Sequence, residues 1–230
     1  MRDDSRTVPT SVQGSIREPA GAIVFDMDGV LADTEPIHRM AIQEVLSRRG
    51  HRIDDAEYAQ LVGLGHDAAW RWMRRRFGLA EEQATYDAEY EAVLLPLLAA
   101  SARLAPGVLE LMAALRAKQV PVALASSSRR GVVKATLDAL GLADAFTVTV
   151  SGDEVARGKP DPEIFLLAAR RLGVRPSACI VVEDSLHGMQ AAALAGMRVI
   201  GVASPFTAGT ELPAELVVRS VDEIARAGCL

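Results

Sequence analysis

The chain has 230 residues, half of them apolar, and a formal net charge of −5 at pH 7. This length and composition exclude intrinsic disorder and allow one large domain, or a domain with a smaller insert, to bury a core. The basic residues gather in no single stripe, which argues against a nucleic-acid partner. No apolar run approaches the roughly 20 residues of a membrane-spanning helix, so we expect no membrane partner either.

The chain start and the cysteines indicate the compartment. Residues 1–20 lack the apolar stretch of a secretory signal, and we expect them to form a flexible tail. Cys179 and Cys229 have no paired spacing, so reduced thiols and a cytoplasmic location are expected, with Cys179 packed in a strand. The oligomeric state leaves no signature in the sequence, and a monomer is compatible with it.

Short apolar runs alternate along the chain with longer segments of helical periodicity. The runs predict five strands, at 22–25, 121–125, 146–150, 178–182 and 198–202. Strands that alternate with helices are typical of a parallel sheet covered by helices on both faces. We therefore predict a Rossmann-like α/β core made of residues 21–34 and 104–230.

A segment of different character separates the first two predicted strands. Residues 35–103 contain no convincing strand, but the stretches 36–50, 67–78 and 81–100 carry helical periodicity. We predict a small all-helical cap domain, inserted after the first strand and joined to the core by two neighbouring crossings. Such an attachment allows a hinged lid over a site. At helical spacing, Trp70, Met73 and Phe77 predict a buried stripe.

Carboxylates follow two of the predicted strands. Asp26 and Asp28 end the first strand, and Glu183 and Asp184 end the fourth. Carboxyl ends of parallel strands meet at one edge of a sheet, so these groups should converge. Buried carboxylates need a partner, and a cluster of oxygen ligands suits Mg²⁺ with a substrate phosphate. Lys159, one of only three lysines, can balance both a carboxylate and a phosphoryl group.

Four motifs carry a family resemblance. "DMDGV" at 26–30, "SSS" at 126–128, "GKPDP" at 158–162 and "VVEDSLHGMQAAALAGM" at 181–197 resemble, in order and spacing, the motifs of the haloacid dehalogenase-like superfamily. The branch they resemble contains helical-cap phosphatases and β-phosphoglucomutase. The resemblance implies a Mg²⁺-dependent phosphatase that acts on a small phosphorylated metabolite, such as a sugar phosphate, through an aspartyl-phosphate.

The resemblance also implies a role for each core residue. Asp26 would be the nucleophile and Asp28 the general acid and base. Mg²⁺ would lie between the Asp26 carboxylate, the Asp28 backbone carbonyl and the Asp184 carboxylate, with Glu183 in support. The groups expected to hold the phosphate or the rest of the substrate are Ser126, Ser127, Lys159, Glu35 and His66. His66 belongs to a loop in which Gly63 and Gly65 allow close approach to the core.

Other interpretations of these residues remain open at the sequence level. Asp26 or Asp28 alone could end a strand in a turn, Ser126 or a neighbouring serine could cap the next helix, and Lys159 could be a solvated loop residue. A β-phosphoglucomutase is the alternative enzyme. It must hold a second phosphate in the cap, yet residues 36–103 contain no lysine, and His66 stands where mutases carry arginine.

Two further alternatives are disfavoured. A dehalogenase does not need the second aspartate, which is present as Asp28. A non-enzymatic binding module would be expected to have lost at least one of Asp26, Asp28, Lys159 and Asp184, and all four are retained.

Overall fold

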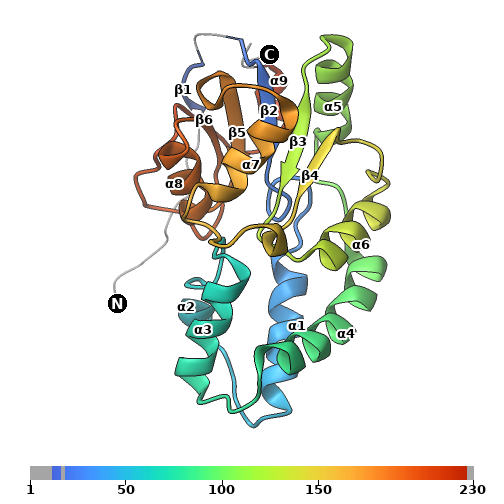
Figure 1. Ribbon diagram of the computed structural model, residues 1–230, viewed down its shortest axis with the longest axis vertical. Coiled ribbons are helices and arrows are strands. Elements are labelled where there is room, and N and C mark those ends of the chain that lie inside the picture. The colour runs from blue at the N-terminus through green and yellow to red at the C-terminus, as the bar shows by residue number, and fades with distance from the viewer. Residues whose placement is uncertain (1–11, 17–18, 227–230) are drawn as a thin grey trace, which may run out of the picture.

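A computed structural model describes residues 12–16 and 19–226. Within these residues, seven strands form a single sheet in the order β1-β7-β6-β5-β2-β3-β4 (Figure 1). β1 is antiparallel to β7, and all other neighbours are parallel. The strands are β1 (Gln13–Gly14), β2 (Ala22–Phe25), β3 (Val122–Ala125), β4 (Val148–Val150), β5 (Cys179–Glu183), β6 (Arg198–Val202) and β7 (Leu216–Val218).

The five predicted strands are all present, as β2 to β6, and the two edge pairings were missed. β1 and β7 are only two and three residues long, too short to show an alternating pattern. The prediction of a flexible tail over 1–20 is wrong at Gln13–Gly14, because their backbone pairs with β7. Residues 1–11 and 17–18, which fall in the same prediction, lie outside the described part of the chain, as does Cys229.

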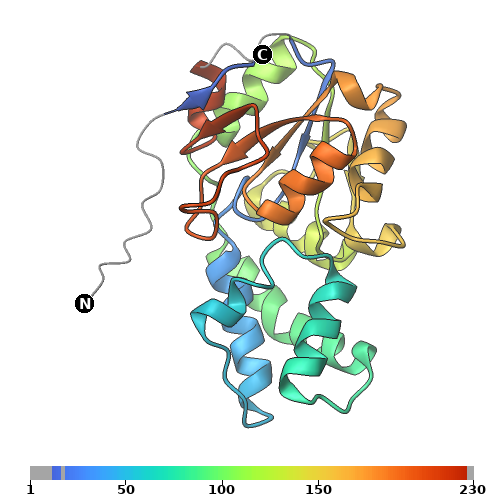
Figure 2. The same cartoon turned by 90° about the vertical axis from the view of Figure 1, so that its left-hand side faces the viewer.

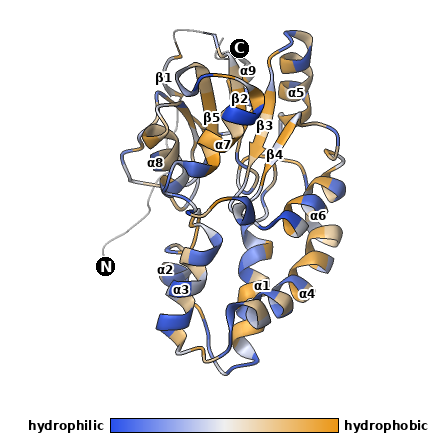
Figure 3. Cartoon of the chain, viewed as in Figure 1, coloured by the Kyte–Doolittle hydropathy of each residue, from blue (hydrophilic) through white to orange (hydrophobic). Residues whose placement is uncertain are grey.

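Alternation along the strands divides the core into two apolar layers. Ile23 and Phe25 of β2 belong to one buried cluster, and Ala22 and Val24 belong to another. Successive side chains of a strand point to opposite faces, so each face needs its own cover. One face carries α5 (Val108–Ala117), α6 (Arg130–Leu140) and α9 (Asp222–Arg226), and the other carries α7 (Glu163–Leu172) and α8 (Leu186–Leu194). β2 and β3 stand out as hydrophobic in Figure 3. The predicted Rossmann-like core is confirmed.

The predicted helical cap lies between β2 and α5. It consists of α1 (Glu35–Ser47), α2 (Asp55–Tyr58), α3 (His66–Phe77) and α4 (Gln83–Ser101). Trp70, Met73 and Phe77 are buried in its own apolar cluster, which confirms the predicted stripe. The four-residue α2 was not predicted, since it is too short to show helical periodicity. Figures 1 and 2 show the cap below the sheet, at the end where the parallel strands finish.

The chain crosses between core and cap twice, at neighbouring places. The Ala105 backbone N–H donates to the Leu31 carbonyl at 2.8 Å, and Ala32 forms an isolated antiparallel bridge with Leu104. The two crossings therefore lie side by side, as expected for a hinged insert. The domain boundaries at residues 35 and 103 stay predictions. No described helix is long and apolar enough to cross a membrane.

Candidate active site

The sheet brings the predicted carboxylates together at one end of β2 and β5. These strands are direct neighbours, with Phe25 opposite Val182, so Asp26 follows one strand beside the last residue of the other, Glu183. One carboxylate oxygen each from Asp26, Glu183 and Asp184 lie within 4.8 Å of one another. All three residues are buried. The convergence expected from the strand ends is present in the structure.

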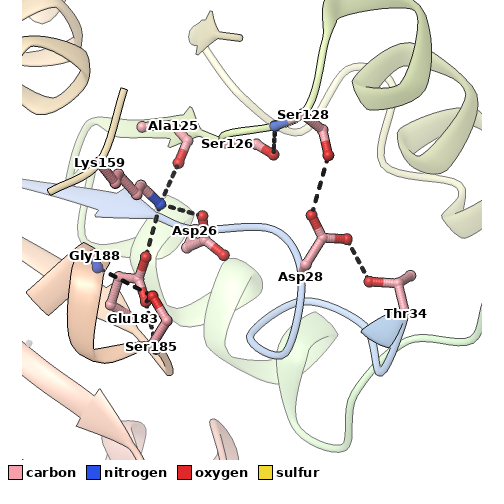
Figure 4. A network of polar contacts seen from close by, with 10 residues as sticks. All are labelled: Asp26, Asp28, Thr34, Ala125, Ser126, Ser128, Lys159, Glu183, Ser185 and Gly188. Carbon is pink, nitrogen blue, oxygen red and sulfur yellow. Dashed lines mark hydrogen bonds and ion pairs between the residues drawn. The ribbon is translucent and has the colours of Figure 1, made fainter. Parts of the chain in front are cut away.

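Lys159 is the cation that compensates this cluster (Figure 4). Its Nζ lies 2.5 Å from Asp26 Oδ1 and 2.7 Å from Glu183 Oε1, and donates to the Ala125 carbonyl at 3.3 Å. Only 1% of the residue is exposed. Burial acts to lower the pKa of Lys159, but the two carboxylates outweigh it and raise that pKa above its usual value. Lys159 is therefore a buried ammonium and not a solvated loop residue.

One lysine does not neutralise three carboxylates. Burial, only partly offset by Lys159, raises the pKa of Asp26 well above its ordinary value. Burial together with the charges of Glu183 and Asp26 raises the pKa of Asp184 in the same way. The oxygen-only set of Asp26, Glu183 and Asp184 thus fits a hard cation such as Mg²⁺, which would supply the missing positive charge.

Glu183 is more committed to the protein than the other two acids. Its Oε1 bonds Lys159, and its Oε2 accepts from the Ser185 backbone N–H at 2.7 Å and from Ser185 Oγ at 2.9 Å. A Cβ at Gly188 would lie 1.6 Å from Glu183 Oε1, so only glycine leaves room for this arrangement. These bonds leave Glu183 less able to bind a cation directly, and a supporting role suits it better. No hydrogen bond from the described residues reaches the Asp184 carboxylate.

Asp28 is held by residues of the crossing into the cap. Its Oδ1 accepts a very short hydrogen bond from Thr34 Oγ1 and faces His38 Nε2 at 3.1 Å, while its Oδ2 lies 3.4 Å from Ser128 Oγ. Burial acts to raise the pKa of Asp28, but His38 and Thr34 outweigh it and leave that pKa below its ordinary value. Asp28 is consequently a carboxylate in the free protein.

The three serines after β3 differ in burial and in hydrogen bonding. Ser126 is fully buried, and its Oγ accepts from the Ser128 backbone N–H at 3.1 Å. Ser127 and Ser128 line the cavity, and Ser127 Oγ is buried with no hydrogen-bond partner in the described part of the chain. Burying a hydroxyl without a hydrogen bond costs folding free energy unless a ligand or water bonds it. Of the three serines, Ser127 is therefore the best placed to bind an anion. None of the three caps α6, whose N-cap is Arg129 with no side-chain bond.

The cap closes the cavity and contributes polar side chains to it. Core and cap residues share the lining, and its polar members are Asp26, Asp28, Glu35, His38, Tyr58, His66, Tyr90, Glu91, Ser127, Ser128, Arg129, Lys159, Asp184 and Ser185. The predicted substrate residues Glu35 and His66 are among them. Both are also bonded within the protein: Glu35 Oε2 accepts from Tyr58 OH at 2.5 Å, and His66 Nε2 lies 3.0 Å from Asp87 Oδ2.

The predicted close approach of the glycine loop is present. The Gly65 N–H donates to the Lys159 carbonyl at 3.1 Å, and a Cβ at Gly65 would come within 2.6 Å of the Gly158 Cα. Next to it, His187 Nδ1 lies 3.1 Å from the Val62 carbonyl. A Cβ at Gly63 would lie 2.2 Å from Ser185 Oγ. The cap loop thus rests directly on the core segments that carry Lys159 and Asp184.

Several lining residues had no signal in the sequence. Tyr90, Glu91 and Arg129 each lie in or next to a helix whose local pattern fits an ordinary solvated or packed position. The same holds for Thr34, which is not part of the lining but bonds Asp28. Arg129 Nη1 reaches Glu91 Oε1 at 2.9 Å and Asp87 Oδ2 at 3.5 Å, which ties the core to α4. Only the packing of the cap against the strand ends reveals these contacts.

Comparison with known proteins agrees with this geometry. A family model described as haloacid dehalogenase-like hydrolase matches residues 20–196. The chain belongs to the haloacid dehalogenase-like hydrolases. The match includes all four motifs up to Gly196, so the family recognised from those motifs is confirmed.

Relatives within this family include phosphatases and a mutase. A probable pseudouridine-5'-phosphatase of Drosophila melanogaster is 38% identical over 79% of this chain and 81% of its own length. The fructose-1-phosphate phosphatase YqaB of Escherichia coli is 34% identical over 80% of this chain and 97% of its own. The crystal structure of β-phosphoglucomutase from Clostridium difficile superposes with a TM-score of 0.79 at 27% identity, covering 89% of this chain and 93% of the other.

We expect Gly65→Ala to hinder closure of the cap, because the new methyl group would collide with the Gly158 backbone. Overpacking of this kind costs about 1–3 kcal/mol, which corresponds to a loss of roughly 5- to 150-fold in kcat/KM if closure precedes chemistry. The measurement is steady-state hydrolysis of a phosphate ester. Gly131→Ala in α6 is the matched control, since its Cβ meets nothing within 4 Å, and equal activity of the two variants would contradict the closure contact.

Proposed function

We propose that the protein is a Mg²⁺-dependent phosphatase that hydrolyses a small phosphorylated metabolite, most directly a sugar phosphate, through an aspartyl-phosphate. The observation that carries the proposal is the pair of carboxylates on one loop with different surroundings. Asp26 is buried against Lys159, and Asp28 is bonded to Thr34 and His38. One carboxylate is thereby suited to attack and the other to proton transfer. We also propose a cytoplasmic location, which the free, buried thiol of Cys179 supports.

The reaction follows in two displacements. Asp26 Oδ2 attacks phosphorus while the bond from phosphorus to the ester oxygen breaks, and Asp28 gives its proton to that leaving oxygen. Asp28, again a carboxylate, then takes a proton from a water as the water attacks the aspartyl-phosphate. The phosphorus–Asp26 bond breaks, and inorganic phosphate leaves with Asp26 regenerated. Asp28 must first take up a proton, which the arrival of an anionic phosphate favours because nearby negative charge stabilises the neutral carboxyl.

The remaining core residues position the phosphoryl group. Lys159 holds Asp26 Oδ1, which fixes the plane of the attacking carboxylate, and it can face the transferring oxygens at the same time. Ser127 offers a hydroxyl that has no hydrogen-bond partner among the described residues. Positioning and cancellation of charge supply most of the catalysis in phosphoryl transfer.

We propose that Mg²⁺ is held by the Asp26 and Asp184 carboxylates and the Asp28 backbone carbonyl, with Glu183 in support. The crowding of Asp26, Glu183 and Asp184 within 4.8 Å and the raised pKa values of Asp26 and Asp184 support this site. When bound, the ion neutralises negative charge on the phosphoryl oxygens.

The charges at the cap end of the cavity favour a phosphatase over a mutase. A mutase has to hold a second phosphate there. Among the described residues that line it, Arg129 is the cation of this region. Arg129 is already paired with Glu91 and Asp87, while His66 is paired with the same Asp87. The region is therefore close to neutral or slightly acidic, and suits the hydroxyl groups of a sugar better than a second phosphate.

The first test combines a substitution with a substrate screen. Asp26→Asn should lower turnover by more than about 1000-fold with the fold intact, because the nearly isosteric amide cannot act as an anionic nucleophile. Phosphorylated metabolites are screened with Mg²⁺, with and without a hexose bisphosphate, and both free phosphate and isomerised sugar are followed. Asp33→Asn, an exposed aspartate of the same segment, is the control. Turnover by Asp26→Asn would refute the nucleophile, and isomerised sugar in place of phosphate would establish the mutase.

The metal site makes a prediction about stability. Because the pKa values of Asp26 and Asp184 are raised in the folded state, protonation stabilises the fold, and this contribution is lost as the pH rises through those values. Mg²⁺ should therefore raise the Tm, increasingly at higher pH, by an amount equivalent to about 2.7 kcal/mol at 100 times its Kd. Asp184→Asn should raise the Tm in chelator and remove the Mg²⁺ shift, and the exposed Asp144→Asn should do neither. An undiminished shift in Asp184→Asn would contradict the site.

Substrate charge gives a further prediction. Glu91→Gln frees Arg129 from its nearer carboxylate and should make the cap end of the cavity more favourable to a second phosphate. We expect the ratio of kcat/KM for a hexose monophosphate to that for the bisphosphate to fall about fivefold, since one charge at this range contributes roughly 1 kcal/mol. Glu110→Gln, an exposed glutamate on α5, is the control. An unchanged ratio in Glu91→Gln would show that this carboxylate does not set the preference.

A further inference from the structure

Asp28 is anchored on one side only. Thr34 Oγ1 and His38 Nε2 both bond Oδ1, whereas within residues 12–16 and 19–226 Oδ2 has a single weak hydrogen bond, at 3.4 Å from Ser128 Oγ. Two hydrogen bonds to the same oxygen restrict rotation of the aspartate carboxyl group about its Cβ–Cγ bond. They leave Oδ2 as the atom that can carry a proton toward the cavity. The direction in which Asp28 acts thus depends on how firmly its two anchors are themselves held.

His38 has a second bond at the opposite edge of its ring. His38 Nδ1 lies 2.5 Å from the hydroxyl of Tyr90, which is supplied by α4 of the cap. An imidazole that is hydrogen-bonded at both nitrogens cannot rotate about its Cβ–Cγ bond without breaking one of those hydrogen bonds. A tyrosine hydroxyl can donate or accept, so it can pair with Nδ1 whether or not that nitrogen carries a proton.

The place of Tyr90 argues for more than packing. Tyr90 lines the same cavity as Asp28 and His38, and its ring stacks on Tyr86 with 12° between the ring planes. Tyr86 is the more buried of the two and directs its hydroxyl to Met73 Sδ, away from the cavity. Two neighbouring tyrosines of one helix therefore share a packing role, but only Tyr90 bonds a polar group next to Asp28.

We propose that Tyr90 is a positioning residue for proton transfer: its hydroxyl holds the His38 ring so that Nε2 fixes Asp28 Oδ1 and Oδ2 faces the leaving oxygen. The proposal rests on the proposed phosphatase function, in which Asp28 protonates that oxygen. Both His38 and Tyr90 belong to the cap, on α1 and α4, which pack against each other. Closure of the cap consequently delivers the pair to Asp28 as one unit.

Leaving-group dependence tests this role. An alkoxide is a strong base and needs the proton, a phenolate needs it less, and p-nitrophenolate needs it least. In Tyr90→Phe we expect kcat/KM to fall about tenfold for fructose 1-phosphate, less for phenyl phosphate, and hardly at all for p-nitrophenyl phosphate. The ratio kcat/KM is the right quantity, because it reports steps only up to release of the alcohol.

Two comparisons separate positioning from packing. Tyr86→Phe, which removes a hydroxyl from the neighbouring ring, should leave all three values near those of the wild type. In the His38→Ala background, adding Tyr90→Phe should cause no further fall in kcat/KM that depends on the leaving group, because Tyr90 acts through His38. An equal fall of Tyr90→Phe on all three esters, or a full additional loss in the double variant, would overturn the positioning role while leaving the phosphatase intact. A wild-type protein that hydrolyses none of the three esters would overturn the proposed function and this role together.

Discussion

The ion pairs of Lys159 with Asp26 and Glu183 are the interaction on which the rest of the site depends. Two carboxylates from neighbouring parallel strands cannot be buried side by side without a cation, and breaking a buried pair typically costs about 3–5 kcal/mol. The surrounding backbone is shaped to this cluster. Gly188 leaves room for Glu183, and a Cβ at Gly29, whose φ is +77°, would lie 2.1 Å from Asp184 Oδ2. Burial of the carboxylates therefore requires both the charge of Lys159 and the space that these two glycines leave.

The cap and the catalytic loop share a short stretch of chain. Thr34 bonds Asp28 and is the N-cap of α1, so the first helix of the cap begins at a residue that already touches the acid. Movement of the cap about the neighbouring crossings at Ala32 and Leu104 cannot leave the surroundings of Asp28 unchanged. Exclusion of water and orientation of Asp28 are thus coupled by chain connectivity.

Paired charges at the far end of the cavity give the cap a second function. Asp87 accepts from His66 and from Arg129 Nη1, and Glu91 accepts from the same Nη1, so α3, α4 and the loop before α6 are joined by one polar cluster. A cluster whose arginine is already paired with carboxylates holds the cap on the core and offers little positive charge to a ligand. The same groups can therefore stabilise closure and limit which phosphate esters are accepted.

The sequence by itself determined the fold class, the family and the carboxylate cluster. Apolar runs mark β2 to β6, and parallel strands deliver the residues after them to one edge, so Asp26, Glu183 and Asp184 were predictable together. Lys159 stood out because lysine is rare in this chain. Tertiary structure alone decided the short pairing of β1 with β7, the choice of Ser127 over Ser126 for the cavity, and the contacts of Tyr90 and Arg129. These depend on how the cap helices pack on the strand ends, a long-range geometry that local periodicity does not record.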